Sequence, residues 1–192
     1  MIGYENKIRE ALVEEHLDFA GSDGLLTLKE TAADSAYQKA FVHGAVAGSL
    51  LIGFHEAGPI PNLAKEEKDK GFRKKCDYAL FTEVNGFPIV FFIELKSLNV
   101  VEKEVVQQLK GGACIADYLH GFTERFLNIP RIKYEERYVV FYRSRTQATP
   151  LSLPMRTRLP FPGQAPNTEP DFALALPDPD TKQYTVQDLI RN

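Results

Sequence analysis

Three charged residues stand at the ends of two strongly apolar stretches of this chain. Asp77 opens the first stretch, and Glu94 and Lys96 close the second. A buried carboxylate is costly unless it is paired, hydrogen-bonded or bound to a cation. Two carboxylates beside an amine could bind a hard divalent cation, activate water and stabilise charge on a phosphodiester. These three residues are therefore the first candidates for a site of chemistry.

The pair Asn85-Gly86, which separates the two stretches, predicts how the candidates are placed. Asn-Gly favours a two-residue type I′ turn, because both central residues need a positive φ. Counting outward from this turn makes Asp77 face Glu94, and facing residues have Cβ atoms about 4.5–5.5 Å apart. Lys96 shares a face with Glu94, since strand side chains alternate. A bulge at the turn would instead place Asp77 diagonally.

With this register, Asp77 and Glu94 are the predicted ligands of Mg²⁺, for which Mn²⁺ could substitute. Lys96 would position the attacking water or neutralise developing charge on the phosphate. The alternative is a salt bridge between Lys96 and one of the carboxylates, without catalysis. If these residues hydrolyse a phosphodiester, replacing Lys96 by alanine is expected to abolish that cleavage and to leave the fold intact.

The elements around these strands predict a mixed α/β (α+β) chain. Hydrophobic spacing predicts helices over about 4–19, 31–48 and 101–120, strands over about 76–83, 87–96 and 137–142, and either state over 49–56. A hairpin followed by a helix and a further strand predicts a helix that crosses over a mixed central sheet. Gly111-Gly112 falls inside that helix, either for close packing on the sheet or for approach of a substrate backbone.

The composition changes beyond Ser144. Eight of the twelve prolines lie between Pro150 and Pro179, which predicts extended loop with short elements over about 171–176 and 184–190. The chain is therefore divided into a core over 1–145 and a C-terminal extension over 146–192. We expect the extension to pack on the core or, in a homodimer, on a partner subunit.

The charge pattern bears on possible partners. A net charge of −3 argues against binding nucleic acid by bulk electrostatics. Basic residues nevertheless gather ahead of the first strand, and arginines recur further on, at Arg137, Arg143, Arg145, Arg156 and Arg158. Arg73, Lys74, Lys75 and Lys110 are candidates for contacts with phosphates. The alternative is that they form an ordinary solvated surface.

Compartment and membrane contact follow from simpler features. No apolar run approaches the roughly 20 residues that a membrane helix needs, and the charged start lacks the apolar core of a signal peptide. Cys76 and Cys114 are expected to be reduced, buried thiols. Together these features predict a cytoplasmic protein without membrane contact.

At the three charged residues the sequence resembles the PD-(D/E)xK nuclease superfamily, whose fold is the restriction-endonuclease-like fold. Asp77 matches the Asp of the motif, with Cys76 in place of the usual preceding Pro, and Glu94-Leu95-Lys96 matches the (D/E)xK element. Gln107-Gln108-Leu109-Lys110 is similar to the Gln-Leu-x-x-Tyr helix of the branch related to RecB-type nucleases, with Gly112 in place of its Tyr. The resemblance covers roughly residues 1–145.

The resemblance implies a Mg²⁺-dependent nuclease, and we expect it to hydrolyse phosphodiester bonds in DNA, although RNA remains an alternative substrate. Gln108 would support the site near the nucleic-acid backbone, or else be an ordinary polar residue of the helix. A further acidic ligand is expected from the first helix, with Glu5 as the first candidate and Glu10 and Glu14 as alternatives. An acid at the start of a helix, such as Glu5, is also favoured by the helix dipole alone.

Two other functions are compatible with the sequence. One is a catalytically inactive member of the same fold that binds nucleic acid or protein. The other is an interaction protein, for example in phage defence or counter-defence, that offers an acidic surface to a basic partner.

Overall fold

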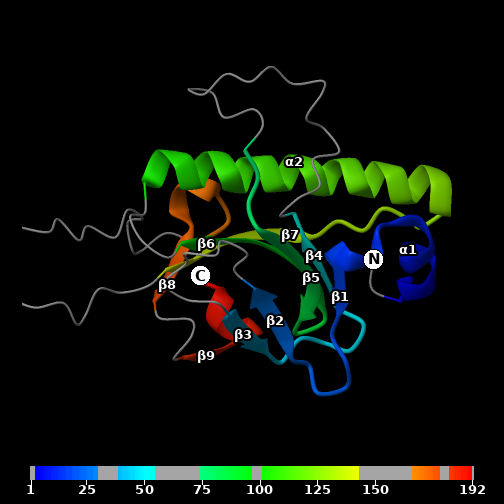
Figure 1. The fold of residues 1–192 in the computed structure, drawn as a ribbon, viewed down its shortest axis with the longest axis horizontal. Helices are drawn as coiled ribbons and strands as arrows, with labels where there is room; N and C mark the ends of the chain where they lie inside the picture. Colours follow the sequence, from blue (N-terminus) through cyan, green and yellow to red (C-terminus); the bar gives the residue numbers. More distant parts are fainter. Residues whose placement is uncertain are drawn as a thin grey trace, which may run out of the picture.

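Two β-sheets and one long helix form the described part of the protein (Figure 1). This computed structural model describes residues 3–29, 39–54, 74–96, 101–142, 166–177 and 182–191. The helices are α1 (Glu5–Ala11) and α2 (Glu102–Leu127), with short 3-10 turns η1 (Glu14–His16), η2 (Pro170–Phe172) and η3 (Val186–Leu189). The strands are β1 (Leu17–Phe19), β2 (Leu26–Lys29), β3 (Lys39–His43), β4 (Leu50–Gly53), β5 (Tyr78–Val84), β6 (Phe87–Lys96), β7 (Glu135–Tyr142), β8 (Leu174–Pro177) and β9 (Gln183–Thr185).

The larger sheet has the order β1-β4-β5-β6-β7-β8, and the smaller sheet has the order β2-β3-β9. In the larger sheet β1, β4, β5 and β6 are antiparallel, whereas β6, β7 and β8 run parallel. A parallel pair needs a long connection, and α2 provides it between β6 and β7. The prediction of a mixed α+β chain with a hairpin, a crossover helix and a further strand is confirmed.

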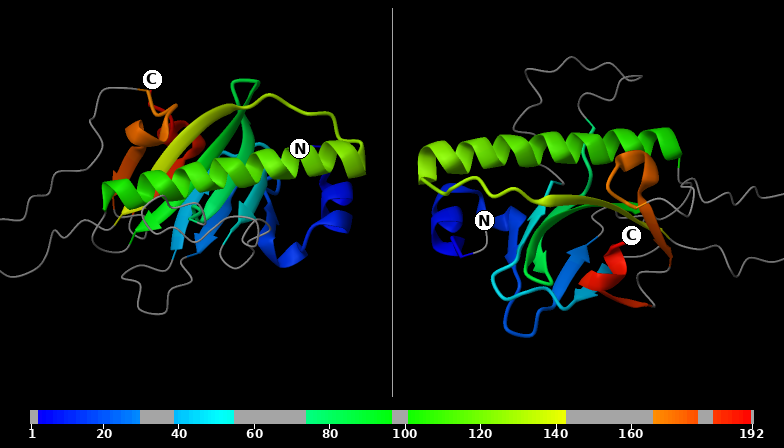
Figure 2. Two further views of the ribbon diagram at one scale, coloured as in Figure 1. Left: turned by 90° about the horizontal axis from the view of Figure 1, so that it is seen from above. Right: turned by 180° about the vertical axis from the view of Figure 1, so that it is seen from behind.

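The larger sheet has a hydrophobic core on each face. Helix α2 covers one face, as the view from above shows in Figure 2, and the smaller sheet covers the other. The core under α2 includes Phe81, Val90, Phe92, Leu109 and Tyr138. The core between the sheets includes Leu28, Val42, Leu80, Phe91 and Phe141. Residues of β6 alternate between these two cores, so Glu94 and Lys96 continue the face of Phe92, toward α2.

The β5–β6 hairpin has the predicted register. Asn85 and Gly86 have φ angles of 53° and 80°, as a type I′ turn requires, and the ladder runs from Val84↔Phe87 to Tyr78↔Ile93. It does not extend to Asp77. The Asp77 amide donates to the Ile93 carbonyl at 3.1 Å, while its own carbonyl accepts from Phe54 at 2.8 Å on the opposite side. The pairing with β6 is therefore shifted by one residue at Asp77, where the direct pair with Glu94 was expected.

The predicted second helix over 31–48 is wrong where it can be compared. Residues 39–43 form β3, in which buried and more exposed side chains alternate. Gly44 and Gly48 then have φ angles of 76° and 80°, which a helix does not admit. Residues 31–38 lie outside the described part. The ambiguous stretch 49–56 contains strand β4, and the first helix ends at Ala11 rather than near residue 19.

The described parts of the C-terminal stretch add a strand to each sheet. Strand β8 pairs parallel with β7, and β9 pairs parallel with β3. The buried Asn167 side chain donates to the carbonyls of Tyr138 in β7 and Leu189 in η3 at 3.1 and 2.9 Å, and so links the larger sheet to the turn that follows β9. In the described residues, no helix has both the length and the apolar character that crossing a membrane requires.

Candidate active site

Glu94 and Lys96 form a buried ion pair near the end of β6. Lys96 Nζ lies 2.6 Å from Glu94 Oε1, and the two side chains are 22% and 2% exposed. Both residues belong to the strand face that lies under α2, where Phe92 and Val90 pack in the core. The pair therefore combines a desolvated carboxylate with an ammonium group that still reaches solvent.

Asp77 is attached to the same strand by its side chain. Its Oδ2 accepts a hydrogen bond of 2.6 Å from the backbone amide of Leu95. Leu95 is the residue between Glu94 and Lys96, so this bond brings the two halves of the motif together. The shifted pairing at Asp77 replaces the expected face-to-face pair, but the two carboxylates still lie at the same end of the hairpin.

Cys76 lies beside both carboxylates and is buried. Burial, and then the charges of Glu94 and Asp77, raise the pKa of its thiol well above the usual value. The thiol donates to the Tyr78 carbonyl at 3.3 Å. It packs against α2, where its sulfur occupies the space that a Cβ at Gly112 would need.

Two glycines let α2 approach this end of the hairpin closely. A Cβ atom at Gly111 would overlap the Lys74 carbonyl, and one at Gly112 would overlap the Cys76 sulfur. Close packing of the helix therefore accounts for both glycines. Gln108 lies one turn before Gly112, and its Oε1 is buried without a hydrogen-bond partner among the described residues.

The basic residues predicted to contact phosphates lie around the same half of α2, apart from Arg73, which is outside the described residues. Lys74 Nζ lies 3.5 Å from Glu104, and Lys110 Nζ lies 3.4 Å from Asp171. Burial lowers the pKa of Lys75. The Lys74 carbonyl lies against Gly111 of α2. The segment that carries Lys74, Lys75 and Asp77 therefore packs on this part of the helix.

The structure does not bring the predicted N-terminal acids to the carboxylate pair. Glu5 and Glu14 both bind Arg9, at 3.1 and 2.7 Å, and Glu10 is exposed. Helix α1 lies beside the far end of α2 (Figure 1), where Lys7 donates to the Leu127 carbonyl at 3.3 Å. Within the described ranges, no group of three or more His, Cys, Asp or Glu side chains is placed to hold a metal ion.

The chemistry of the donor set nevertheless fits a hard cation. Asp77 and Glu94 supply carboxylate oxygens, and Mg²⁺ is commonly bound through one or two carboxylates with water and phosphate oxygens as the remaining ligands. Both cysteines are free, and Cys114 is exposed rather than buried as expected. Sequence reasoning missed the Leu95 amide as the partner of Asp77, although its position inside Glu-x-Lys was the available signal.

The carboxylates of Asp77 and Glu94, the ammonium group of Lys96 and the backbone amide of Leu95 thus lie at the open end of one hairpin. This set could serve metal-assisted hydrolysis, and it could equally be a structural ion-pair network. Comparison with known proteins found no matching family model, no matching curated protein and no matching solved structure.

Proposed function

We propose that this chain is a Mg²⁺-dependent nuclease of the PD-(D/E)xK type that hydrolyses phosphodiester bonds in DNA. The observation that carries the proposal is the hydrogen bond from the Leu95 amide to Asp77, because it joins Asp77 to the Glu94–Lys96 pair. The order of α1, the antiparallel strands β4 to β6, the crossover helix α2 and the parallel strand β7 supports a restriction-endonuclease-like core.

Each residue has a role that follows from its position. Asp77 and Glu94 would hold Mg²⁺, which supplies water activation and charge neutralisation when it is bound. The Lys96 ammonium, partly exposed beside Glu94, would donate hydrogen bonds to the attacking water or to a phosphate oxygen. Gln108 would turn its buried amide to the same end of the hairpin. Lys74, Lys75 and Lys110 would contact phosphates of the substrate.

A cleavage panel tests this proposal directly. Linear, circular, single-stranded and branched DNA, and RNA, are incubated with and without Mg²⁺, and products are separated by size. We expect DNA products with Mg²⁺ only, their loss in Lys96→Ala, and their retention in Lys103→Ala, which removes an exposed lysine of α2. Cleavage that resists a chelator, or that Lys96→Ala leaves unchanged, contradicts the assignment.

One observation favours a second function, that of a catalytically inactive member of the fold that binds nucleic acid or protein. Both acids already have partners inside the protein, Lys96 for Glu94 and the Leu95 amide for Asp77. Such a site would hold the hairpin together without a cation. Retained binding of DNA or of a protein partner, with no cleavage of any substrate in the panel, would support this function.

A further inference from the structure

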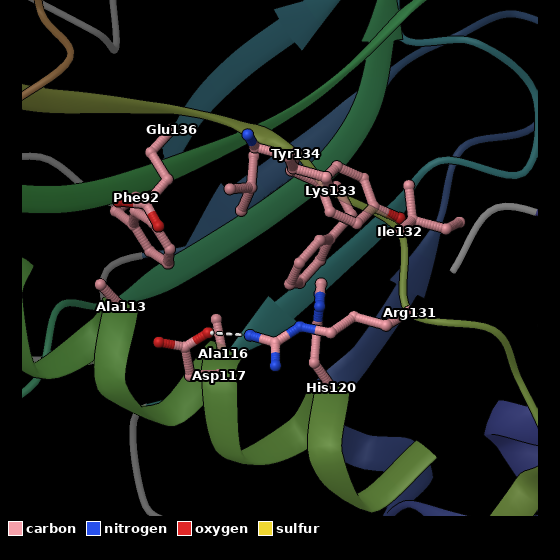
Figure 3. Close-up of a pocket in the computed structure, with 12 residues that line it drawn as sticks. Phe92, Ala113, Ala116, Asp117, His120, Arg131, Ile132, Lys133, Tyr134 and Glu136 are labelled. Carbon is pink, nitrogen blue, oxygen red and sulfur yellow. Dashed lines mark hydrogen bonds and ion pairs between the residues drawn. The ribbon is translucent and has the colours of Figure 1, made fainter. Parts of the chain in front are cut away.

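A second feature of the face under α2 is a cavity of about 430 Å³ (Figure 3). It lies between α2, strands β5 and β6, and the segment that leads into β7, and Asp77 and Glu94 do not line it. Its volume falls within the roughly 300–1,000 Å³ of small-molecule sites. Phe92 lines it and stands two residues before Glu94, which places the cavity roughly 7 Å along the strand from the candidate active site.

Aromatic rings form one wall of the cavity. The ring centroids of Phe81, His120 and Tyr134 lie 5.3–5.6 Å from one another. Phe81 and Phe92 are fully buried and form the floor, whereas His120 and Tyr134 remain partly exposed. Partly exposed rings above an apolar floor can accept the flat face of a nucleobase, because stacking on aromatic side chains holds bases of any sequence.

His120 adds a polar group that the described part of the protein does not satisfy. Its Nε2 is buried and has no hydrogen-bond partner among the described residues. Burial, and also the nearby charge of Arg131, lower the pKa of the ring, so that it is neutral near pH 7. A neutral imidazole has one donor and one acceptor nitrogen, which suits the edge of a nucleobase.

Cationic side chains stand at the opening of the cavity. Arg131 is 57% exposed and reaches across to Asp117 of α2 at 3.0 Å, as Figure 3 shows. Lys133 is exposed on the same segment. Guanidinium groups bind phosphate oxygens in a planar, two-pronged geometry. An exposed ion pair such as Arg131–Asp117 is weak enough for a phosphate to share the arginine.

We propose that this cavity binds one nucleotide unit, with the base stacked on Tyr134, its edge at His120 Nε2, and the phosphate at Arg131 and Lys133. The nucleotide is either free or an unpaired residue of a strand that extends to Asp77 and Glu94. Only the second source rests on the proposed nuclease function, since the chemistry of the cavity is the same for both.

Isothermal titration in a chelator, where no cleavage occurs, tests the proposal. The probes are the four deoxynucleoside monophosphates, their nucleosides and a ten-residue single-stranded oligonucleotide. We expect saturable binding of a monophosphate, weakened about tenfold or more by Arg131→Gln, which removes charge-assisted hydrogen bonds. Arg125→Gln, an exposed arginine of α2 away from the cavity, should leave binding unchanged.

A cavity-filling variant provides an independent readout. Ala116 lines the cavity from α2, and Ala116→Leu should weaken nucleoside and nucleotide alike, with folding checked by circular dichroism. If the oligonucleotide also binds and Arg131→Gln weakens it, the source is a strand; if only the monophosphate binds, the source is a free nucleotide. Failure of all four monophosphates to bind saturably, or binding that Arg131→Gln leaves unchanged, overturns the proposal.

The two proposals fail separately. Nucleotide binding without any Mg²⁺-dependent cleavage would contradict the nuclease function and leave the cavity assignment standing. Cleavage that depends on Lys96, in a protein that binds no monophosphate, would contradict the cavity assignment alone.

Discussion

The carboxylate of Asp77 accepts a hydrogen bond of 2.6 Å from the backbone amide of Leu95 at the open end of the β5–β6 hairpin. The regular ladder ends one residue later, at Tyr78↔Ile93, and the Asp77 amide also binds Ile93, so that the pairing is shifted by one residue at Asp77. The side chain therefore adds a second link between Asp77 and β6, beside the backbone bond to Ile93. Because Leu95 separates Glu94 from Lys96, this link joins Asp77 to the segment that carries the buried ion pair.

The first prediction separates the structural role of Asp77 from its chemical role. Asp77→Asn keeps an oxygen that can accept the hydrogen bond from the Leu95 amide, so the free energy of unfolding should change little. Asp77→Ala loses a hydrogen bond to a charged group and should destabilise the protein by about 1.5–3 kcal/mol. Both variants should lose Mg²⁺-dependent cleavage. Urea unfolding and the DNA cleavage panel measure the two effects.

Equal stability of Asp77→Asn and Asp77→Ala would contradict the role of this hydrogen bond in closing the hairpin. Cleavage by Asp77→Asn at the wild-type rate would contradict the assignment of Asp77 as a metal ligand, whatever its stability.

The second prediction concerns the buried pair of Glu94 and Lys96. Because the Glu94 side chain is only 2% exposed, Lys96→Met leaves a buried carboxylate without its ammonium partner. Breaking a buried pair on one side costs about 3–5 kcal/mol, and the 22% exposure of Lys96 places this case toward the lower end. Lys96→Ala should therefore cost stability as well as activity, contrary to the expectation from sequence that the fold is left intact.

A double variant provides the control for this pair. Glu94→Gln with Lys96→Met removes both charges and should recover most of the stability lost in Lys96→Met, because no unpaired charge remains buried. Urea midpoints of the single and double variants give the coupling. Additive losses would mean that the two side chains do not interact in the folded protein.

The third prediction concerns metal binding without reference to cleavage. A cation that binds the folded state alone raises the free energy of unfolding, by about 2.7 kcal/mol at a concentration 100 times its Kd. Mg²⁺ should raise the thermal midpoint of the wild type and have little effect on Asp77→Asn or Glu94→Gln. An equal rise in all three proteins would show that Mg²⁺ acts elsewhere.

The hairpin could be predicted from sequence because its determinants are local. Asn85-Gly86 fixes the turn through positive φ angles, and the turn fixes the register of every pair from Val84↔Phe87 to Tyr78↔Ile93. The shifted pairing at Asp77 could not be predicted, since Asp77 is also held by Phe54 of another segment, whose amide donates to the Asp77 carbonyl. Local signals therefore placed Asp77, Glu94 and Lys96 at the same end of the hairpin, and tertiary contacts set the geometry there.

Small residues misled the interpretation of residues 39–48. Ala40, Gly44, Ala45 and Gly48 fall at helical spacing, yet the two glycines adopt positive φ and the chain turns. Strand β3 is held by β2 and by β9, which lies far along the sequence. The nucleotide cavity was beyond sequence reasoning for the same reason, because it requires α2 and the segment before β7 to meet.

The fourth prediction uses two glycines of the same helix. A Cβ at Gly111 would overlap the Lys74 carbonyl, whereas one at Gly121 would meet nothing within 4 Å. Gly121→Ala should stabilise the protein by about 0.5–1 kcal/mol through helix propensity. Gly111→Ala should destabilise it and displace the segment that carries Asp77, with loss of cleavage. Thermal unfolding of both variants tests this contrast, and equal effects would contradict the close approach of α2.

The last prediction concerns the pH dependence of stability at His120. Burial is the main cause that lowers the pKa of the folded ring below its usual value near 6.5, and the charge of Arg131 adds to it, although Asp117 and Glu124 act in the opposite direction. As the pH falls below about 6.5, the unfolded chain takes up the proton first, so stability decreases. The contribution of His120 is thus fully present above that pH and is lost toward the lower pKa of the folded state.

His120→Phe keeps an aromatic ring and removes the titration, so its free energy of unfolding should fall less than that of the wild type between pH 7.5 and 5. Urea unfolding across this range isolates His120 from the other histidines by difference. Parallel curves for the two proteins would show that the ring titrates alike in the folded and unfolded states, and that the cavity does not desolvate it.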